Sequence, residues 1–156
     1  MTDLMIIERE SLTPPALIAP REVKSLASFP FSMQARFRDM EAQYLNLILR
    51  GWNRCDIAFA VGVREFRGEI EMAFRVRKAP AMDVAAKIRS SCRDSDLATI
   101  RQQLMAFARV VSYETEVINS WNGIGRVFHR DHATVVYAVK KYGRALCRAL
   151  EKNHAT

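Results

Sequence analysis

The side chains most able to do chemistry in this sequence form one short polar cluster of Arg130, Asp131, His132 and Thr134, between two apolar segments. A carboxylate accepts hydrogen bonds, an imidazole can donate or accept them, and a threonine offers both a hydroxyl and a methyl group. These groups can recognise the edges of nucleic-acid bases if the fold exposes them together.

The segments that flank this cluster have the pattern of two helices joined by a tight turn. Residues 122–128 place apolar side chains at helical spacing, and Ser120 or Asn122 can cap the start of this helix. The predicted break is His129-Arg130, and Asp131 can cap the helix that follows. The apolar positions of the second helix are Val135, Ala138, Val139, Tyr142 and Leu146. The pattern predicts a helix-turn-helix.

The opposite face of the second predicted helix is basic and carries one aromatic ring. Its residues are Ala133, Tyr137, Lys140, Lys141, Arg144 and Arg148. Such a helix fits the major groove of DNA, with its first-turn residues at base edges and its basic flank along the phosphates. Phosphates repel a carboxylate, so Asp131 is useful there only if it accepts a hydrogen bond from a cytosine amino group, a role compatible with capping the helix.

The run IGRVFHRDHATVVYAVKKY, residues 124–142, resembles the C-terminal helix-turn-helix domain of the bacterial replication initiator DnaA. That family's signature is an isoleucine-glycine pair, an apolar residue, then arginine-aspartate-histidine followed by a small residue, threonine and valine. The matching positions are Ile124, Gly125, Phe128, Arg130, Asp131, His132, Ala133, Thr134 and Val135. Upstream, Arg101-Gln102 resembles the pair that opens the preceding helix. The resemblance departs from the family at Ala133, where threonine is usual, and in a longer segment between Arg101-Gln102 and Ile124.

The resemblance implies an all-α, DnaA- or Trp-repressor-like fold that binds double-stranded DNA. The implied base contacts are Asp131, His132, Ala133 and Thr134. The candidates for contacts with the DNA backbone are Arg101, Arg109, Arg126, Arg130, Tyr137, Lys140 and Lys141. Phosphate contacts set position and affinity without encoding sequence, and any single one of these charges can instead be solvated. Arg89 and Arg93 are candidates for the minor groove, because they flank a loop that resembles the family's basic loop.

The chain before residue 81, where this domain is predicted to start, divides into an arm and a helical module. Residues 1–30 hold four of the five prolines and are predicted to form an extended arm. Residues 31–80 form the helical module, and Pro80 marks its boundary with the domain at 81–150. Residues 151–156 are a tail. The fold class is therefore all-α, with two small helical modules.

The helical module contains a weaker signal of its own. Ile57-Ala58 followed by Val61-Gly62-Val63 has the spacing of a generic helix-turn-helix, in which the glycine makes the turn. It weakly resembles LuxR-type regulators and sigma-factor region 4. Two alternatives stay open: a second DNA-binding head, with Arg64 and Arg67 as its contacts, or a helical packing or dimerisation module.

Composition limits the other classes of function. The net charge of +7 and the pI near 9.7 favour a polyanionic partner. Three dispersed cysteines argue against a disulfide framework and a zinc site, and no carboxylate or histidine cluster suggests a metal, a cofactor or catalysis. The sequence has no phosphate-binding GxxxxGK[ST] loop and no apolar run of membrane-spanning length. These observations predict a cytoplasmic, nucleoid-associated protein that is not an enzyme and has no small-molecule substrate.

The function predicted from the sequence is a sequence-specific transcriptional regulator of a bacterium or phage. One alternative is a replication modulator that competes with the initiator for its DNA boxes. Another is an adaptor whose N-terminal module binds RNA polymerase, a sigma factor or a co-regulator while the C-terminal domain anchors it on DNA.

Overall fold

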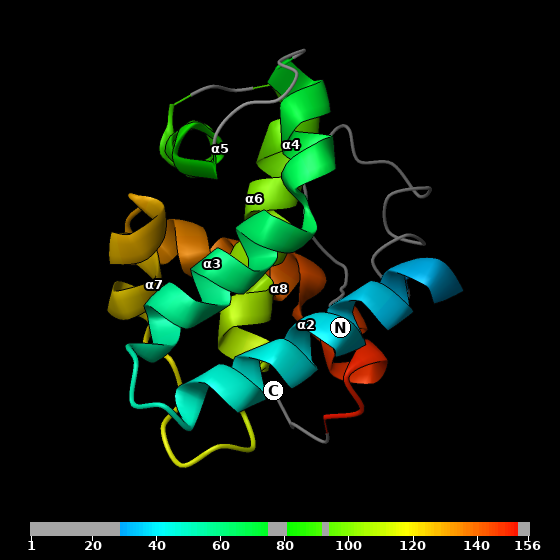
Figure 1. Cartoon of the computed structure of the whole chain (residues 1–156), viewed down its shortest axis with the longest axis vertical. Helices are drawn as coiled ribbons and strands as arrows, with labels where there is room; N and C mark the ends of the chain where they lie inside the picture. The colour runs from blue at the N-terminus through cyan, green and yellow to red at the C-terminus, as the bar shows by residue number, and fades with distance from the viewer. Residues whose placement is uncertain (1–28, 75–80, 92–93, 153–156) are drawn as a thin grey trace.

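The structure is a computed structural model that describes residues 29–74, 81–91 and 94–152. Within these ranges every regular element is a helix, which confirms the all-α prediction (Figure 1). The helices are α2 (Phe31–Ile48), α3 (Arg54–Glu65), α4 (Arg67–Phe74), α5 (Ala81–Arg89), α6 (Ser95–Val110), α7 (Trp121–Phe128) and α8 (His132–Ala149). The predicted arm lies outside the described residues except for Phe29 and Pro30, and so does the tail from residue 153. Among the described helices, none combines the length and apolar composition that a bilayer span requires.

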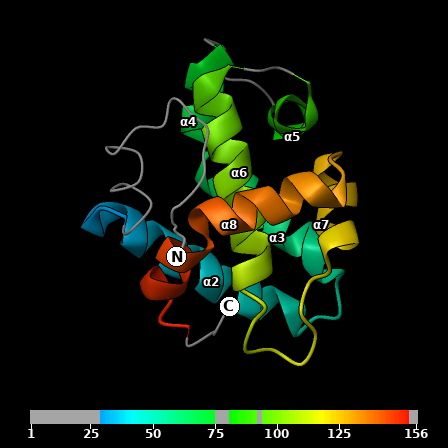
Figure 2. The same cartoon turned by 180° about the vertical axis from the view of Figure 1, so that it is seen from behind.

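The two predicted modules pack on each other around one hydrophobic core. Helix α6 lies between α3 and α8, as Figures 1 and 2 show from opposite sides. Phe37 of α2 links the two halves, because its ring centroid lies 5.8 Å from that of Phe66 and 6.1 Å from that of Phe107 on α6. Aromatic rings at these separations pack favourably. The N-terminal helices therefore complete the core beneath the C-terminal ones.

The start of α6 is earlier than the sequence pattern predicts. The apolar period of this helix is clear only from Ile100 onward, but α6 begins at Ser95 because Asp94 caps it. The Asp94 carboxylate accepts hydrogen bonds from the backbone N–H groups of Asp96, at 3.0 Å, and Leu97, at 3.1 Å. Leu97 is fully buried, so the first turn of α6 already belongs to the core.

Gly62 lies inside α3, so the prediction that it makes a helix-turn-helix turn is wrong. A Cβ atom at this position would lie 2.7 Å from Cδ2 of Leu104 on α6. The missing side chain lets the two helices approach closely, which is a packing requirement and not a turn. The chain turns at Phe66, between α3 and α4. Arg64 donates to the side-chain oxygen of Gln43, and Arg67 pairs with Glu71 at 3.1 Å; their role as a second DNA-binding head stays a prediction.

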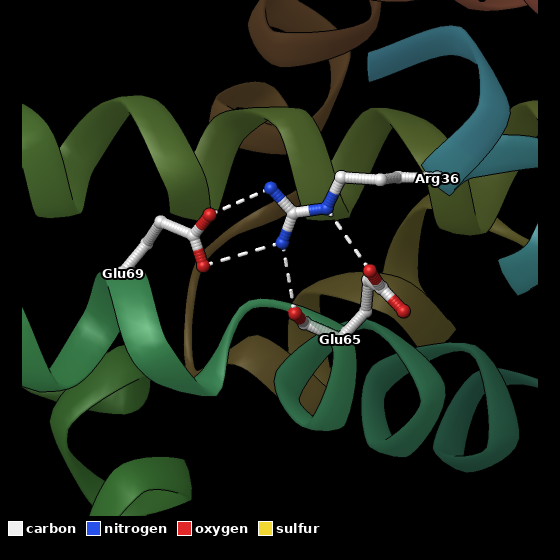
Figure 3. A network of polar contacts seen from close by, with 3 residues as sticks. All are labelled: Arg36, Glu65 and Glu69. Atoms are coloured by element: carbon white, nitrogen blue, oxygen red, sulfur yellow. Dashed lines mark hydrogen bonds and ion pairs between the residues drawn. The ribbon is translucent and has the colours of Figure 1, made fainter. Parts of the chain in front are cut away.

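A polar network holds α2 against the junction of α3 and α4 (Figure 3). Arg36 donates from Nε to Glu65 Oε2 at 2.9 Å and from Nη1 to Glu69 Oε2 at 2.6 Å. Its guanidinium also lies 4.2 Å from the centre of the Phe66 ring. Planar guanidinium groups favour this combination of forked hydrogen bonds and stacking. The network fixes the angle at which α2 meets the turn at Phe66.

This network predicts a pH dependence of stability. The hydrogen bond from Arg36 holds the pKa of Glu69 below its ordinary value of 4.5. A carboxyl whose pKa falls on folding contributes stability above its unfolded pKa and loses it as pH falls through the folded pKa. Glu69→Gln should therefore lower the free energy of unfolding near neutral pH, by less than about 1 kcal/mol because water screens a half-exposed pair.

Urea denaturation at neutral and at acidic pH checks this expectation. The difference between wild type and Glu69→Gln should shrink well below pH 4.5, where the carboxyl of the wild type is protonated. Glu151→Gln, in the exposed turn after α8, is the matched control and should show no difference at either pH. A deficit in Glu69→Gln that stays constant with pH would mean that the ionised carboxylate is not what stabilises the contact.

Candidate nucleic-acid interface

Helix α7 has the boundaries that local sequence rules predict. The hydroxyl of Ser120 accepts a hydrogen bond from the backbone N–H of Gly123 at 2.9 Å, so Ser120 is the N-cap. Ile124 and Phe128 are fully buried and fix the helix against the core. The helix ends at His129, whose φ of 57° is left-handed. This residue reverses the chain direction, and the predicted break at His129-Arg130 is confirmed.

Gly125 is required by the way the chain turns after α7. The backbone N–H of Arg130 donates to the carbonyl oxygen of Gly125 at 2.8 Å. A Cβ atom on Gly125 would lie 2.4 Å from the carbonyl oxygen of Arg130, which is closer than van der Waals contact allows. The turn therefore passes directly over the bare Cα of this glycine, and it carries the chain into α8.

Asp131 caps α8. Its Oδ1 accepts hydrogen bonds from the backbone N–H of Thr134 at 2.9 Å and from the Thr134 hydroxyl at 2.7 Å. These bonds favour the ionised form and lower the pKa of Asp131. Asp131 is fully exposed, and both of these bonds end on Oδ1, so Oδ2 can accept a hydrogen bond from another molecule. The carboxylate can thus cap the helix and contact a ligand at the same time.

The first turn of α8 presents the predicted base-contact residues on the surface. Asp131, His132 and Ala133 are exposed and Thr134 is partly exposed. We call these four residues the reading tip. The buried face of α8 consists of Val135, Ala138, Tyr142, Gly143, Ala145, Leu146 and Ala149. The predicted opposite face is exposed at Tyr137, Lys140, Arg144 and Arg148, and partly exposed at Lys141. Figure 2 shows the start of α8 beside α7 and its body crossing α6.

Residues 84–141 match the family described as the bacterial DnaA protein helix-turn-helix. The C-terminal half thus resembles the DnaA helix-turn-helix. The match covers the reading tip and the helices that hold it, and it indicates a DNA-binding domain. No curated protein and no solved structure matches the chain.

Two of the arginines predicted to contact phosphates bind carbonyl oxygens of this DnaA-like domain. Arg101 is only 5% exposed, and it donates from Nε to the carbonyl oxygen of Ile88 at 2.6 Å and from Nη2 to that of Ser90 at 3.2 Å. Arg109 donates to the carbonyl oxygen of Asn119 at 2.8 Å and stacks 3.8 Å from the centre of the Trp121 ring. Both arginines help to hold the domain together, because helix-end and loop carbonyls lack other donors. The prediction for Arg101 is corrected to a buried structural contact, whereas Arg109 is partly exposed and its phosphate contact stays a prediction.

Arg130 and Arg89 join the end of α5 to the turn of the DnaA-like domain. Arg130 donates to the carbonyl oxygens of Ser90, at 2.6 Å, and Arg89, at 3.2 Å. Arg89 donates to the carbonyl oxygen of Val127 at 2.7 Å and lies over the Phe59 ring. With these contacts, Arg130 positions the turn and Arg89 packs on Phe59 of α3. Both are partly exposed, and their contacts with the DNA backbone and the minor groove stay predictions. Arg93 lies outside the described residues.

The carbonyl oxygens at the end of α5 are the part of the site that sequence reasoning missed. The last carbonyls of a helix have no intrahelical donors, and arginine side chains commonly satisfy them. Here Arg101 and Arg130 both donate to Ser90. We use the name α5 clasp for the carbonyl oxygens of Ile88, Arg89 and Ser90 together with the side chains of Arg101 and Arg130 that donate to them. Of the predicted backbone contacts, Arg126, Tyr137 and Lys140 are exposed beside the reading tip and Lys141 is partly exposed.

Proposed function

We propose that the protein binds double-stranded DNA in a sequence-specific manner and acts as a transcriptional regulator, with the start of α8 in the major groove. The single observation that supports this best is the reading tip, whose Asp131, His132 and Ala133 are exposed at the front of a helix that the core supports from behind. A helix placed this way brings its first-turn side chains to base edges.

Each residue of the reading tip has a distinct part in this proposal. Oδ2 of Asp131 accepts a hydrogen bond from the amino group of a cytosine, while Oδ1 keeps the cap. His132 contacts a base acceptor or donor. Ala133 can make only an apolar contact, such as one with a thymine methyl group. Arg126 on α7 and Lys140 on α8, both exposed, contact phosphates and set the orientation.

We base the proposed role in transcription on the DnaA-like helix-turn-helix and its exposed reading tip. The sequence has no GxxxxGK[ST] loop, so the chain has no P-loop with which to drive DNA remodelling. The protein would act by occupying promoter DNA and contacting or blocking the polymerase. Mapping of bound DNA in the native host tests this role. Bound sites at promoters support it, whereas sites confined to initiator boxes at a replication origin contradict it.

Two substitutions separate base contacts from phosphate contacts. His132→Ala should reduce binding to the preferred duplex by about 10- to 100-fold while leaving binding to random duplex nearly unchanged. Lys140→Ala should weaken binding to both duplexes equally and reduce the slope of log affinity against log salt by about one. Fluorescence anisotropy with the two duplexes over a range of salt concentrations measures both effects. Equal losses on both duplexes in His132→Ala would contradict the base contact.

Asp131→Asn is the control that separates capping from base recognition. Asparagine caps helices as well as aspartate does, so α8 and the thermal stability should be preserved. Asparagine also offers an amino group, so the base preference of the variant at the contacted position should move away from cytosine. Selection from a random duplex pool detects that change. An unchanged preferred sequence would show that Asp131 serves only as the cap.

A further inference from the structure

Exposed apolar side chains gather at one end of the molecule, away from the reading tip. Eight large hydrophobic side chains are exposed among the described residues. Five of them lie in two places: the end of α2 with the turn to α3, and the loop between α6 and α7. These five are Leu45, Leu49, Trp52, Val117 and Ile118. Trp52 is 62% exposed and Leu49 is 84% exposed. We call these five residues the apolar end face.

The two segments that form this face are held against each other by polar contacts. Asn119, which follows Ile118, donates to the hydroxyl of Tyr44 at 3.4 Å, one residue before Leu45. Glu114, at the start of the same loop, shares the Lys152 ammonium with Glu41 of α2. The loop therefore runs along the C-terminal half of α2, and Figure 1 shows it beside the α2–α3 turn at the lower edge.

Charges of opposite sign border the two halves of the face. Arg50, between Leu49 and Trp52, is exposed, and Glu116 precedes Val117 and is also exposed. A surface that carries a basic segment on one side and an acidic segment on the other is complementary to itself after a two-fold rotation. In that arrangement Arg50 of one copy faces Glu116 of the other, twice across the interface, with the apolar side chains between them.

The position of the face leaves the reading tip accessible. The face adjoins the N-terminal end of α7, while the reading tip follows the C-terminal end of the same helix. An eight-residue helix spans about 12 Å, so a partner on the face need not cover Asp131 or His132. Two linked copies would present two reading tips, as dimeric DNA-binding proteins do for paired half-sites.

We propose that the apolar end face is a homodimer interface, with a second copy of this chain as its partner. Trp52 is the largest side chain of this face and is 62% exposed, and tryptophan is among the residues that contribute most to association. Arg50 and Glu116 set the two-fold orientation, because other orientations of the two copies would bring like charges together. The interface forms without DNA, so its test is independent of the proposed function.

Sedimentation equilibrium of the full chain without DNA measures the association. The wild type should show a concentration-dependent dimer, and Trp52→Glu should raise the dissociation constant by about 30-fold or more. Met72→Glu is the matched control, because Met72 is 77% exposed on α4, at the other end of the molecule, and should dimerise like the wild type.

A charge-exchange experiment tests the orientation. Arg50→Glu and Glu116→Arg should each weaken the homodimer, since each places like charges opposite one another twice. An equimolar mixture of the two variants should form a heterodimer, because both charge pairs are then opposite again. A wild type that stays monomeric up to its solubility limit, equal effects of Trp52→Glu and Met72→Glu, or a mixture that stays monomeric would each overturn the proposal. At concentrations where the wild type is also monomeric, a lower thermal stability of Trp52→Glu than of the wild type would also overturn it, by showing that the same chain covers the face.

Discussion

Gly125→Ala is expected to lower the free energy of unfolding by about 3 kcal/mol and to abolish sequence-specific DNA binding. The added methyl group would lie 2.4 Å from the carbonyl oxygen of Arg130, and backbone cannot move aside as a flexible side chain can. Either the turn after α7 opens or the hydrogen bond from Arg130 to Gly125 breaks. In both cases the start of α8 is displaced from its place beside α7. Urea denaturation and anisotropy with the preferred duplex measure the two losses.

Gly68→Ala is the matched control for this substitution. Gly68 lies in α4, and a Cβ atom there would meet nothing within 4 Å. Because alanine favours helix more than glycine does, this variant should gain up to about 1 kcal/mol and bind DNA normally. If Gly125→Ala were as stable as the wild type, the chain would turn differently after Phe128 from the path described above.

Arg101→Ala is expected to cost about 3 kcal/mol of stability, the second largest effect. Its guanidinium is buried and donates to the carbonyl oxygens of Ile88 and Ser90, which would be left without these donors. Buried acceptors that lose their donors are strongly unfavourable. Chemical denaturation measures the loss. Under conditions where the variant is folded, the salt dependence of its DNA binding should match the wild type, since Arg101 neutralises no phosphate.

Arg126→Ala should show the opposite pattern. Arg126 is exposed on α7, so its removal should change stability by less than about 0.5 kcal/mol. Its loss should reduce the salt slope of DNA binding by about one if it contacts a phosphate. A normal stability for Arg101→Ala together with a reduced salt slope would instead support a phosphate contact by Arg101.

The helix-turn-helix could be predicted because its determinants are local. The Ser120 cap, the break at His129 and the Asp131 cap each depend on residues within one or two turns of the chain. The apolar spacing of α8 also indicated correctly which face is buried. These signals need no knowledge of the rest of the fold.

The sequence could not predict which arginines are buried and which are exposed, because tertiary contacts determine this. Arg101 and Arg126 look alike in the sequence, yet one is buried against the end of α5 and the other is exposed. The sequence around Arg101 does not indicate that its guanidinium donates to the carbonyl oxygens of Ile88 and Ser90. The role of Gly62 could not be predicted for the same reason. Only the contact with Leu104 on α6 explains why this position inside α3 has no side chain.

The shared core of the N-terminal helices was also beyond the sequence pattern. Helical periodicity can identify apolar residues such as Phe37 of α2, but it does not say that Phe107 of α6 covers this side chain. In the structure α2 and α3 cover α6 and α8, so the residues before Pro80 support the fold of the DnaA-like domain.

The α5 clasp links the position of the reading tip to α5, because Arg130, directly before Asp131, donates to the carbonyl oxygens at the end of that helix. Ser90 accepts from Arg130 at 2.6 Å and from Arg101 at 3.2 Å, so one carbonyl oxygen ties the turn before α8 to the middle of the core. A shift of α5 by a fraction of an ångström would tilt Asp131 and His132 relative to a duplex. If the reading tip contacts bases as proposed, the choice of DNA target depends on the scaffold as well as on those side chains, and substitutions in α5 should change it.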